Sequence, residues 1–380
     1  MTATFTRSRL ALFALAGVLL LSIAGSVSGA KFAVNAYHQM NLVSDVPGLA
    51  LRVDSNLVNP WGMAFSPTGP FWIANAGTGT STVYDRTGRK FPRSNPLVVT
   101  IPPPPGADAG ETAEPTGMVW NGTGGFQQTI NGVTAPAVFI WVTEGGTIAG
   151  WNPSWSRSNA FTIVDNSSLD ANYKGVELAS FNGNNYLYAA DFHNGKIAIF
   201  DSLFASVTTV SANAAPFVDP NLPTGYAPFN IRNIGGNLYV AYAQQDAEAA
   251  DEVAGPGLGI VDVYSPDGTF IKRLISNGNL NAPWGMAMAP GNFGVFSNML
   301  LVGNFGDGTI NAYDPSTGAY VGTIKDKKGN NIVIDGLWSI QFGSGAGDGG
   351  RANALYFTAG IQDESHGLFG QINTIPGGDD

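Results

Sequence analysis

The chain has 380 residues, of which 50 are glycine and only 12% are charged, a composition that favours many short strands and tight turns over helices. The formal net charge of −10 excludes nucleic acid as an expected partner, because binding to phosphates needs clustered lysine and arginine. The sequence contains no cysteine, which excludes disulfides, thiolate metal sites and cysteine nucleophiles.

Residues 1–30 have the pattern of a secretory signal peptide. Arg7 and Arg9 precede an apolar run at residues 10–23, and the small residues Ser28 and Ala30 precede a cleavage point. The run is shorter than the ~20 residues that cross a bilayer, and an uncleaved membrane anchor is the alternative. We therefore expect a secreted protein, extracellular or periplasmic, with no membrane contact after cleavage.

An internal repeat follows the leader. The segment Pro-Trp-Gly-Met occurs at residues 60–63 and again at 283–286, and four related segments keep its register. The third residues of the six copies stand at positions 62, 117, 175, 230, 285 and 339, so successive copies are 54 to 58 residues apart. A period of this length, with several short strands in each copy, is typical of β-propeller blades.

Each copy predicts an apolar first strand, a second strand and a third strand that ends in turn residues. The second strands are expected at residues 71–75, 140–144, 187–191, 238–242, 300–304 and 355–359. The sixth copy ends without an outer strand, which residues 40–43 can supply, so that no sheet edge stays open. We predict an all-β chain: one six-bladed β-propeller over residues 31–375, closed by its N-terminal strand, and a short acidic tail at residues 376–380.

Several longer segments carry a family resemblance. They are GYAPFNI at 225–231, QDA at 245–247 with DEVAG at 251–255, NAPWG at 281–285, NFGDG at 304–308 and DGLW at 335–338. With these segments the chain resembles an uncharacterised family of secreted bacterial six-bladed β-propeller proteins and, more distantly, the NHL-repeat and gluconolactonase-like propellers. The resemblance implies the fold and no activity, because one fold hosts many functions.

The residues just before the six repeat positions are expected around one mouth of the central channel. They are Trp61, Thr116, Lys174, Phe229, Trp284 and Trp338. The four aromatic residues come from adjacent blades, and rigid aromatic faces suit sugar rings or apolar ligands. We predict that they bind a carbohydrate or small molecule together with Lys174. Packing between blades is the alternative, since large aromatic side chains are normally core residues.

The second strand ends in an oxygen-bearing side chain in four copies, at Asn75, Glu144, Asp191 and Asn304. Glu114 and Glu177 lie close to the repeat positions of the second and third copies. Oxygen ligands on convergent loops are what Ca²⁺ requires, so the four residues are candidate calcium ligands. The gluconolactonase-like propellers hold such an ion at the channel mouth. Capping of the following turn by these side chains is the alternative.

Two turns are long and acidic, with Asp246, Glu248, Asp251 and Glu252 in the fourth copy and Asp363 and Glu364 in the sixth. The glycines after Glu252 lead into a strand rather than a helix, which excludes a dinucleotide loop and leaves a lid or cation loop.

No catalytic motif is present, and three histidines spread along the chain exclude most histidine-based sites. The sequence leaves open whether the protein is an enzyme, and it assigns no catalytic residue. We expect a monomeric binding module for a carbohydrate or small-molecule ligand at the channel mouth. A Ca²⁺-dependent hydrolase of the lactonase type is the alternative.

Overall fold

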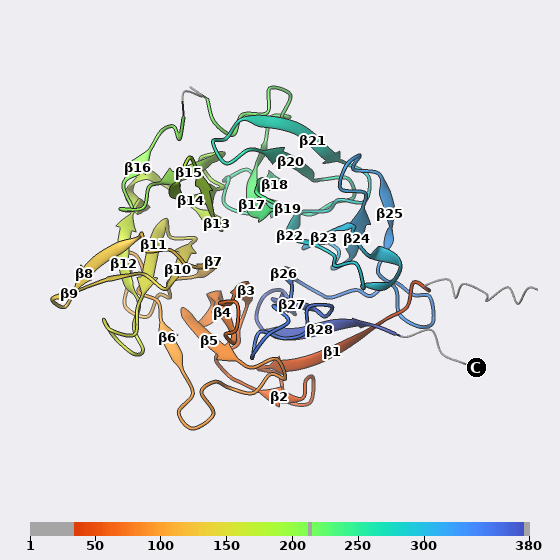
Figure 1. The fold of residues 1–380 in the computed structure, drawn as a ribbon, viewed down its shortest axis with the longest axis horizontal. Helices are drawn as coiled ribbons and strands as arrows, with labels where there is room; N and C mark the ends of the chain where they lie inside the picture. Colours follow the sequence, from red (N-terminus) through yellow and green to blue (C-terminus); the bar gives the residue numbers. More distant parts are fainter. Residues whose placement is uncertain (1–33, 212–214, 376–380) are drawn as a thin grey trace, which may run out of the picture. The chain divides into compact units, whose positions relative to one another are not determined.

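The computed structural model describes residues 34–211 and 215–375. The predicted signal peptide at residues 1–30 and the acidic tail at residues 376–380 lie outside the described residues, so both stay predictions. The regular secondary structure of the described part is almost entirely strand, and apart from one two-stranded sheet its strands form six sheets arranged as the blades of a β-propeller (Figure 1).

Each blade is an antiparallel sheet whose strands follow the chain from the innermost strand outward, except that the outermost strand of blade six comes from the N-terminal part of the chain. Blade one consists of β3 (Pro60–Ala64), β4 (Phe71–Asn75), β5 (Thr80–Tyr84) and β6 (Val98–Thr100). Blade two consists of β7 (Pro115–Trp120), β10 (Phe139–Thr143), β11 (Thr147–Trp151) and β12 (Phe161–Asp165). Blade three consists of β13 (Tyr173–Phe181), β14 (Asn184–Asp191), β15 (Lys196–Phe200) and β16 (Ser206–Val207).

The remaining blades keep this order. Blade four consists of β17 (Tyr226–Ile234), β18 (Asn237–Gln245), β20 (Ile260–Tyr264) and β21 (Phe270–Ser276), with β19 (Glu252–Val253) paired to β18. Blade five consists of β22 (Pro283–Met288), β23 (Leu300–Asn304), β24 (Ile310–Tyr313) and β25 (Tyr320–Thr323). Blade six consists of β26 (Leu337–Phe342), β27 (Leu355–Ala359), β28 (Leu368–Thr374) and β1 (Tyr37–Ser44).

A few elements lie outside this pattern. They are the strand β2 (Arg52–Val53), the hairpin of β8 (Gln127–Ile130) and β9 (Val133–Pro136), and the 3-10 turns η1 (Ala76–Thr78), η2 (Ser167–Leu169) and η3 (Gly294–Phe296). Within residues 34–211 and 215–375, no helix has the length and apolar character needed to span a membrane.

The innermost strands form a closed ring. β3, β7, β13, β17, β22 and β26 contact one another in this order, and β26 contacts β3 again (Figure 1). The second strands are buried on both faces between neighbouring blades, so strands such as β4 and β10 are apolar up to a buried polar last residue, Asn75 or Thr143, instead of alternating with polar residues.

The glycine of the repeat is explained by the narrowness of this ring. A Cβ atom on Gly62 would lie 2.5 Å from the carbonyl oxygen of Thr116 on the next blade, and one on Gly285 would lie 2.6 Å from that of Trp338. Neighbouring inner strands approach too closely there for any side chain. The fourth and sixth copies have Asn230 and Ser339 in place of glycine, and Asn230 donates a hydrogen bond to the Trp284 carbonyl at 2.7 Å.

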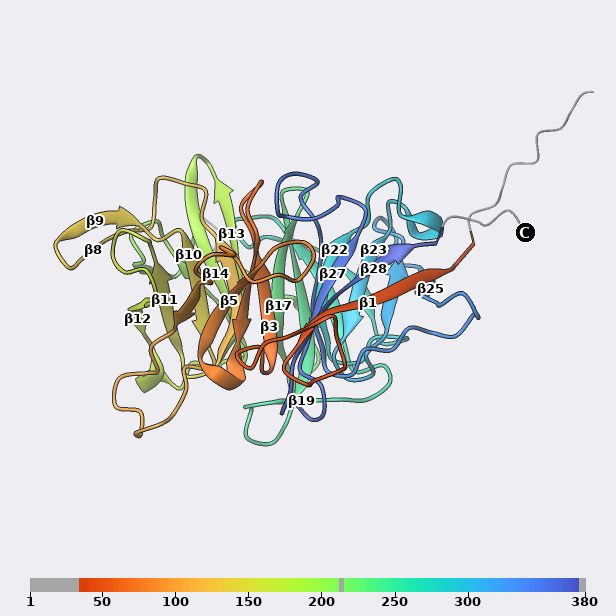
Figure 2. The same ribbon diagram turned by 90° about the horizontal axis from the view of Figure 1, so that it is seen from below.

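The N-terminal strand closes the ring, as the sequence predicts. β1 pairs antiparallel with β28, in a register from Tyr37 opposite Thr374 to Ser44 opposite Leu368 (Figure 2). Blade six is therefore built from both ends of the propeller. Since the pairing supplies its outer strand, β28 has no open edge.

Candidate functional site

One end of the ring gathers the starts of the inner strands and the ends of the second strands. Pro60 pairs with Asn75 in blade one, Tyr173 with Asp191 in blade three, and Pro283 with Asn304 in blade five. We call this end the channel mouth. The candidate ligand-binding and calcium-binding residues of the sequence analysis lie at the channel mouth, because the repeat places them at these strand ends.

A cavity of about 460 Å³ opens at the channel mouth. We call it the acidic cavity; its lining consists of Asn59, Trp61, Ala76, Gly77, Glu114, Glu144, Asp251, Glu252 and Glu364. The five carboxyl groups come from blades two, four and six; four lie on loops, and Glu252 begins β19. No lysine or arginine of the described residues is in that lining.

Lys174 lies buried beneath this lining. Its ammonium forms ion pairs with Glu144 and with Asp251, the latter at 3.1 Å, and lies 5.4 Å from the ring centroid of Trp61. Burial by itself would lower the pKa of Lys174, but the carboxylates around it, Glu144 foremost, raise the pKa above its ordinary value. Lys174 is therefore held as a cation that orders two carboxylates, and it is no amine nucleophile.

Three carboxyl groups of the acidic cavity hold their protons more tightly than free side chains do. Burial raises the pKa of Glu252 to about 8, against the opposing effect of Lys174. Burial also raises the pKa of Glu114, with a further contribution from Glu144, and that of Glu364. The cavity thus combines a largely protonated carboxyl, at Glu252, with groups that accept hydrogen bonds.

The four aromatic residues predicted at the mouth meet, but they face one another. Trp61, Phe229, Trp284 and Trp338 are each at most 4% exposed and belong to one core cluster. Trp61 stacks on Trp338 with ring centroids 3.4 Å apart and contacts Phe229 of blade four edge-on at 6.4 Å. Because blades one and four are opposite each other in the ring, these rings pack across the axis. Ligand binding by them stays a prediction, and of the four only Trp61 lines the acidic cavity.

Hydrogen bonding distinguishes Trp61 from the other two tryptophans. Trp338 donates from Nε1 to Asn59 Oδ1 at 3.1 Å, and Trp284 donates to the Lys174 carbonyl at 3.2 Å. Trp61 Nε1 has no hydrogen-bond partner among the described residues, although the side chain is only 2% exposed. A buried donor without a partner carries a desolvation cost, which a hydrogen-bond acceptor bound beside Trp61 would offset.

The predicted calcium ligands do not converge. Asn75 donates to Thr82 Oγ1 at 3.1 Å, and Asn304 donates to the Asn279 carbonyl at 2.8 Å. Asp191 accepts from the side chain of Asn194 at 3.0 Å. These contacts are those of side chains that fix their own turns. Glu144 alone of the four lines the acidic cavity.

Among the described residues, no three His, Asp or Glu side chains are grouped so that they could hold a metal ion. The four predicted ligands thus do not fit a single Ca²⁺, and we assign no catalytic step to a metal. Calcium binding stays a prediction.

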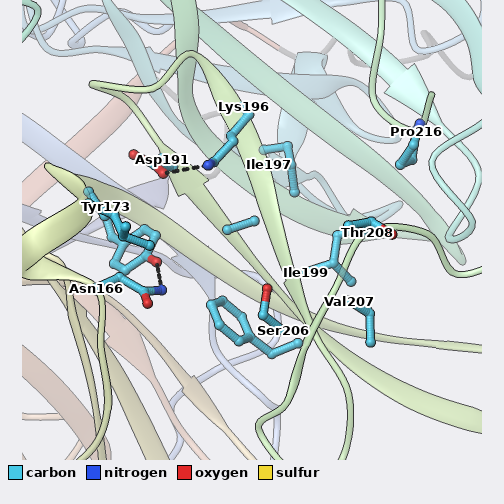
Figure 3. Close-up of a pocket in the computed structure, with 14 residues that line it drawn as sticks. Asn166, Tyr173, Asp191, Lys196, Ile197, Ile199, Ser206, Val207, Thr208 and Pro216 are labelled. Atoms are coloured by element: carbon cyan, nitrogen blue, oxygen red, sulfur yellow. Dashed lines mark hydrogen bonds and ion pairs between the residues drawn. The ribbon is translucent and has the colours of Figure 1, made fainter. Parts of the chain in front are cut away.

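Asp191 borders a different cavity, of about 390 Å³, on the flank of blade three (Figure 3). There Lys196 approaches Asp191 to 3.8 Å, and Asn166 donates a hydrogen bond to the Tyr173 hydroxyl at 2.8 Å. Glu177 is also away from the acidic cavity: it accepts from the Asn233 backbone at 3.1 Å.

The arrangement of Glu364 could not be read from the sequence. Its loop holds Gln362, Asp363 and Glu364 with φ values of 57°, 51° and 62°, a left-handed conformation that is unusual for residues other than glycine. Asn59 of blade one donates to Glu364 Oε2 at 2.5 Å and holds the carboxylate at the cavity. The available signal was the acidic turn of the sixth copy, which left a lid or a cation loop open and did not indicate its neighbour in blade one.

Comparison with known proteins assigns the chain to a family, although no protein-family model matches it. It is 35% identical over 352 residues to "Uncharacterized protein R648" of Acanthamoeba polyphaga mimivirus, covering 90% of this chain and 82% of that protein. The chain belongs to the family of this mimivirus protein. "Uncharacterized protein L690" of the same virus is another relative, 33% identical over 355 residues, with 90% of this chain and 87% of that protein covered.

The solved structures that resemble this chain are propellers, and their sequence identity to it is low. A streptogramin B lyase structure matches with a TM-score of 0.50 and 12% identity, covering 89% of this chain and 97% of that chain. A Bacteroides thetaiotaomicron protein of unknown function matches with a TM-score of 0.52 and 12% identity, covering 89% and 76%. These matches support the β-propeller fold expected from the sequence, and the six blades are those of the structure itself. The bacterial and secreted character of the expected family stays a prediction, since the reported relatives are mimivirus proteins.

Proposed function

We propose that the protein is a binding propeller that takes a small cationic ligand in the acidic cavity. The observation that carries the proposal is the cavity lining, in which five carboxyl groups surround one space and the nearest lysine is buried and already paired. The unpartnered Nε1 of Trp61 is a second, independent indication of a missing group. A cation would relieve the mutual repulsion of the carboxylates, and its positive charge would be largely neutralised by them.

Calorimetric titration with two amines, glucosamine and spermidine, tests the proposal on the full chain. Glu364→Gln removes one charge while its amide oxygen still accepts from Asn59, so we expect weaker amine binding in an otherwise intact site. The matched control is Glu248→Gln, an exposed residue of the blade-four loop outside the cavity lining. Binding should also weaken with added salt, because partly exposed charges are screened over ~10 Å at 0.1 M. Failure of both amines to bind would overturn the proposal.

A hydrolase that opens a lactone or ester is the second candidate, favoured by two kinds of carboxyl group in one cavity. Glu252, with a pKa raised to about 8, can donate a proton at neutral pH, and Glu144 in the same lining accepts a hydrogen bond from Lys174. A proton donor beside an acceptor can protonate a leaving alkoxide while a water is deprotonated. Acid release from δ-valerolactone, followed in a pH-stat, is the test. Glu252→Gln should abolish it, and a rate no faster than the uncatalysed one removes this candidate.

Calcium binding at the mouth is tested separately, by melting chelator-treated protein with and without millimolar calcium. An ion that binds only the folded state stabilises it by about 2.7 kcal/mol at a hundredfold excess over Kd. That would raise Tm by a few degrees, and magnesium should do less because it prefers tighter octahedral sites. An identical Tm with and without calcium, together with no calcium on metal analysis, would contradict calcium binding at the channel mouth.

A further inference from the structure

We infer that the ligand of the acidic cavity is a hydroxylated amine of the amino-sugar class, a compact ring that bears an ammonium group and several hydroxyls. This inference rests on the proposed function and narrows its ligand. It follows from the hydrogen-bonding capacity of the lining, from the orientation of Trp61, and from a second acidic cavity that adjoins the first.

The lining is polar on almost all sides. Apart from Trp61 and the small residues Ala76 and Gly77, every residue of the acidic cavity carries a carboxyl or amide group. A long methylene chain would lie against these groups and leave them without partners. Hydroxyls satisfy them, because a carboxylate accepts hydrogen bonds from hydroxyl and ammonium donors alike.

Trp61 offers its edge to the ligand. One face of its ring is covered by Trp338, stacked at 3.4 Å, and a ring at that distance leaves no room for the Lys174 ammonium on the same face. Lys174 therefore lies over the other face. Both faces are occupied, so the contribution of Trp61 to the lining is an edge of its ring. Its Nε1 is buried and has no partner among the described residues.

An indole N–H only donates, so the group that satisfies it must accept. An ammonium nitrogen cannot accept a hydrogen bond, whereas a hydroxyl oxygen can. A second donor in the lining is the carboxyl of Glu252, which keeps its proton at neutral pH. Asn59 donates one of its two amide hydrogens to Glu364 and accepts from Trp338, which leaves its second amide hydrogen as a further donor. A ligand with ammonium groups alone would leave the Trp61 donor unpaired.

A second cavity, of about 300 Å³, adjoins the first and shares Glu364 with it. Asp335 and Asp363 repeat the acidic character there, and the aromatic ring of Phe305 lines it, stacked on Trp338 at 4.1 Å. The two cavities therefore repeat one pattern, of carboxylates beside an aromatic side chain. Two linked amino-sugar rings fit this repetition better than one.

Calorimetry with four probes on the unaltered full chain tests the inference, and it needs no folding control. The probes are the β-1,4-linked glucosamine disaccharide, glucosamine, N-acetylglucosamine and spermidine. We expect the disaccharide to bind most tightly. Removing the charge by acetylation, or the hydroxyls in spermidine, should each weaken binding by roughly tenfold or more relative to glucosamine, about the value of one good polar contact.

Variants then locate the contacts. Trp61→Phe removes the N–H and keeps an aromatic ring, so it should weaken glucosamine but leave spermidine unchanged. Asp363→Asn should weaken the disaccharide more than the monomer, because Asp363 lines only the second cavity. Melting curves identify any variant that is misfolded, and Glu248→Gln is the charge control.

The outcomes separate the two proposals. If spermidine binds as tightly as glucosamine, the amino-sugar inference is wrong and the cation-binding function stands. If N-acetylglucosamine binds as tightly as glucosamine, charge is not recognised, and both are wrong. If no probe binds, both are likewise overturned.

Discussion

Lys174 is the residue that holds two carboxylates of the channel mouth in place. Its side chain is fully buried while Glu144 and Asp251, its partners, are 22% and 73% exposed. The lysine is therefore a fixed positive charge beneath partly hydrated carboxylates. Its place before a repeat position suggested contact with a ligand, but the structure puts it behind the cavity wall, where it holds two wall residues.

We expect Lys174→Met to destabilise the protein by about 2 to 3 kcal/mol, because the carboxylates of Glu144 and Asp251 lose their counter-charge. Breaking a fully buried ion pair costs ~3 to 5 kcal/mol. The expected cost is smaller here because both carboxylates reach solvent. Urea unfolding measures the change. Adding Glu144→Gln to the variant should restore part of the stability. Lys327→Met, at an exposed position, is the control and should change little. A Lys174→Met protein as stable as the parent would mean that the ion pairs contribute nothing.

At the scale of the element, the inner strands depend on their glycines. Gly62 in β3 and Gly124 in the loop after β7 differ in one respect: a Cβ on Gly62 meets backbone at 2.5 Å, whereas one on Gly124 meets nothing within 4 Å. We expect Gly62→Ala to cost about 2 to 4 kcal/mol through a shift of the two inner strands, and Gly124→Ala to stay within ~0.5 kcal/mol of the parent. Denaturant midpoints of both variants check this. Equal midpoints would refute the close-approach explanation of the repeat.

The outer part of blade four contains a buried acid. Asp262 on β20 is fully buried, and burial together with the neighbouring Asp219 raises its pKa from 3.8 to about 8, opposed by Arg273. Arg273 pairs with Asp219, and the Tyr264 hydroxyl, itself bonded to Tyr242, faces Asp262 at 3.4 Å. The folded state therefore keeps a proton that the unfolded chain releases.

The sign of the pH dependence follows from that difference. Below pH 3.8 both states are protonated at Asp262, and the group has no effect. As pH rises to about 8, stability falls, by at most ~1.4 kcal/mol per pH unit, and then levels off. Asp262→Asn imitates the protonated form, so it should stabilise the protein at pH 8 and change it little at pH 4. Melting curves at both pH values decide, and an equal effect at both would contradict the raised pKa.

The whole molecule depends on closure by β1. Residues 37–44 pair with β28 along its length, so their loss would expose an unpaired strand edge in blade six. We expect deletion of residues 31–45 to give aggregated or poorly folded protein, observed as large species in size-exclusion chromatography. A monomeric deletion variant with an unchanged Tm would show that the ring does not need this strand.

The sequence by itself determined the fold, because the repeat is local: each copy contains its own strands and turns, and six copies at one period must close into a ring. It also showed the long acidic turns of the fourth and sixth copies. Only the tertiary structure decided which side chains contact one another at the channel mouth. The bond from Asn59 to Glu364, the position of Lys174 behind Glu144, and the contact of Trp61 with Phe229 join residues far apart in the chain. No periodicity encodes such contacts, since they depend on side chains of different blades meeting in space. For that reason the sequence left open whether the four aromatic residues at the mouth pack or bind, and it did not predict the acidic cavity.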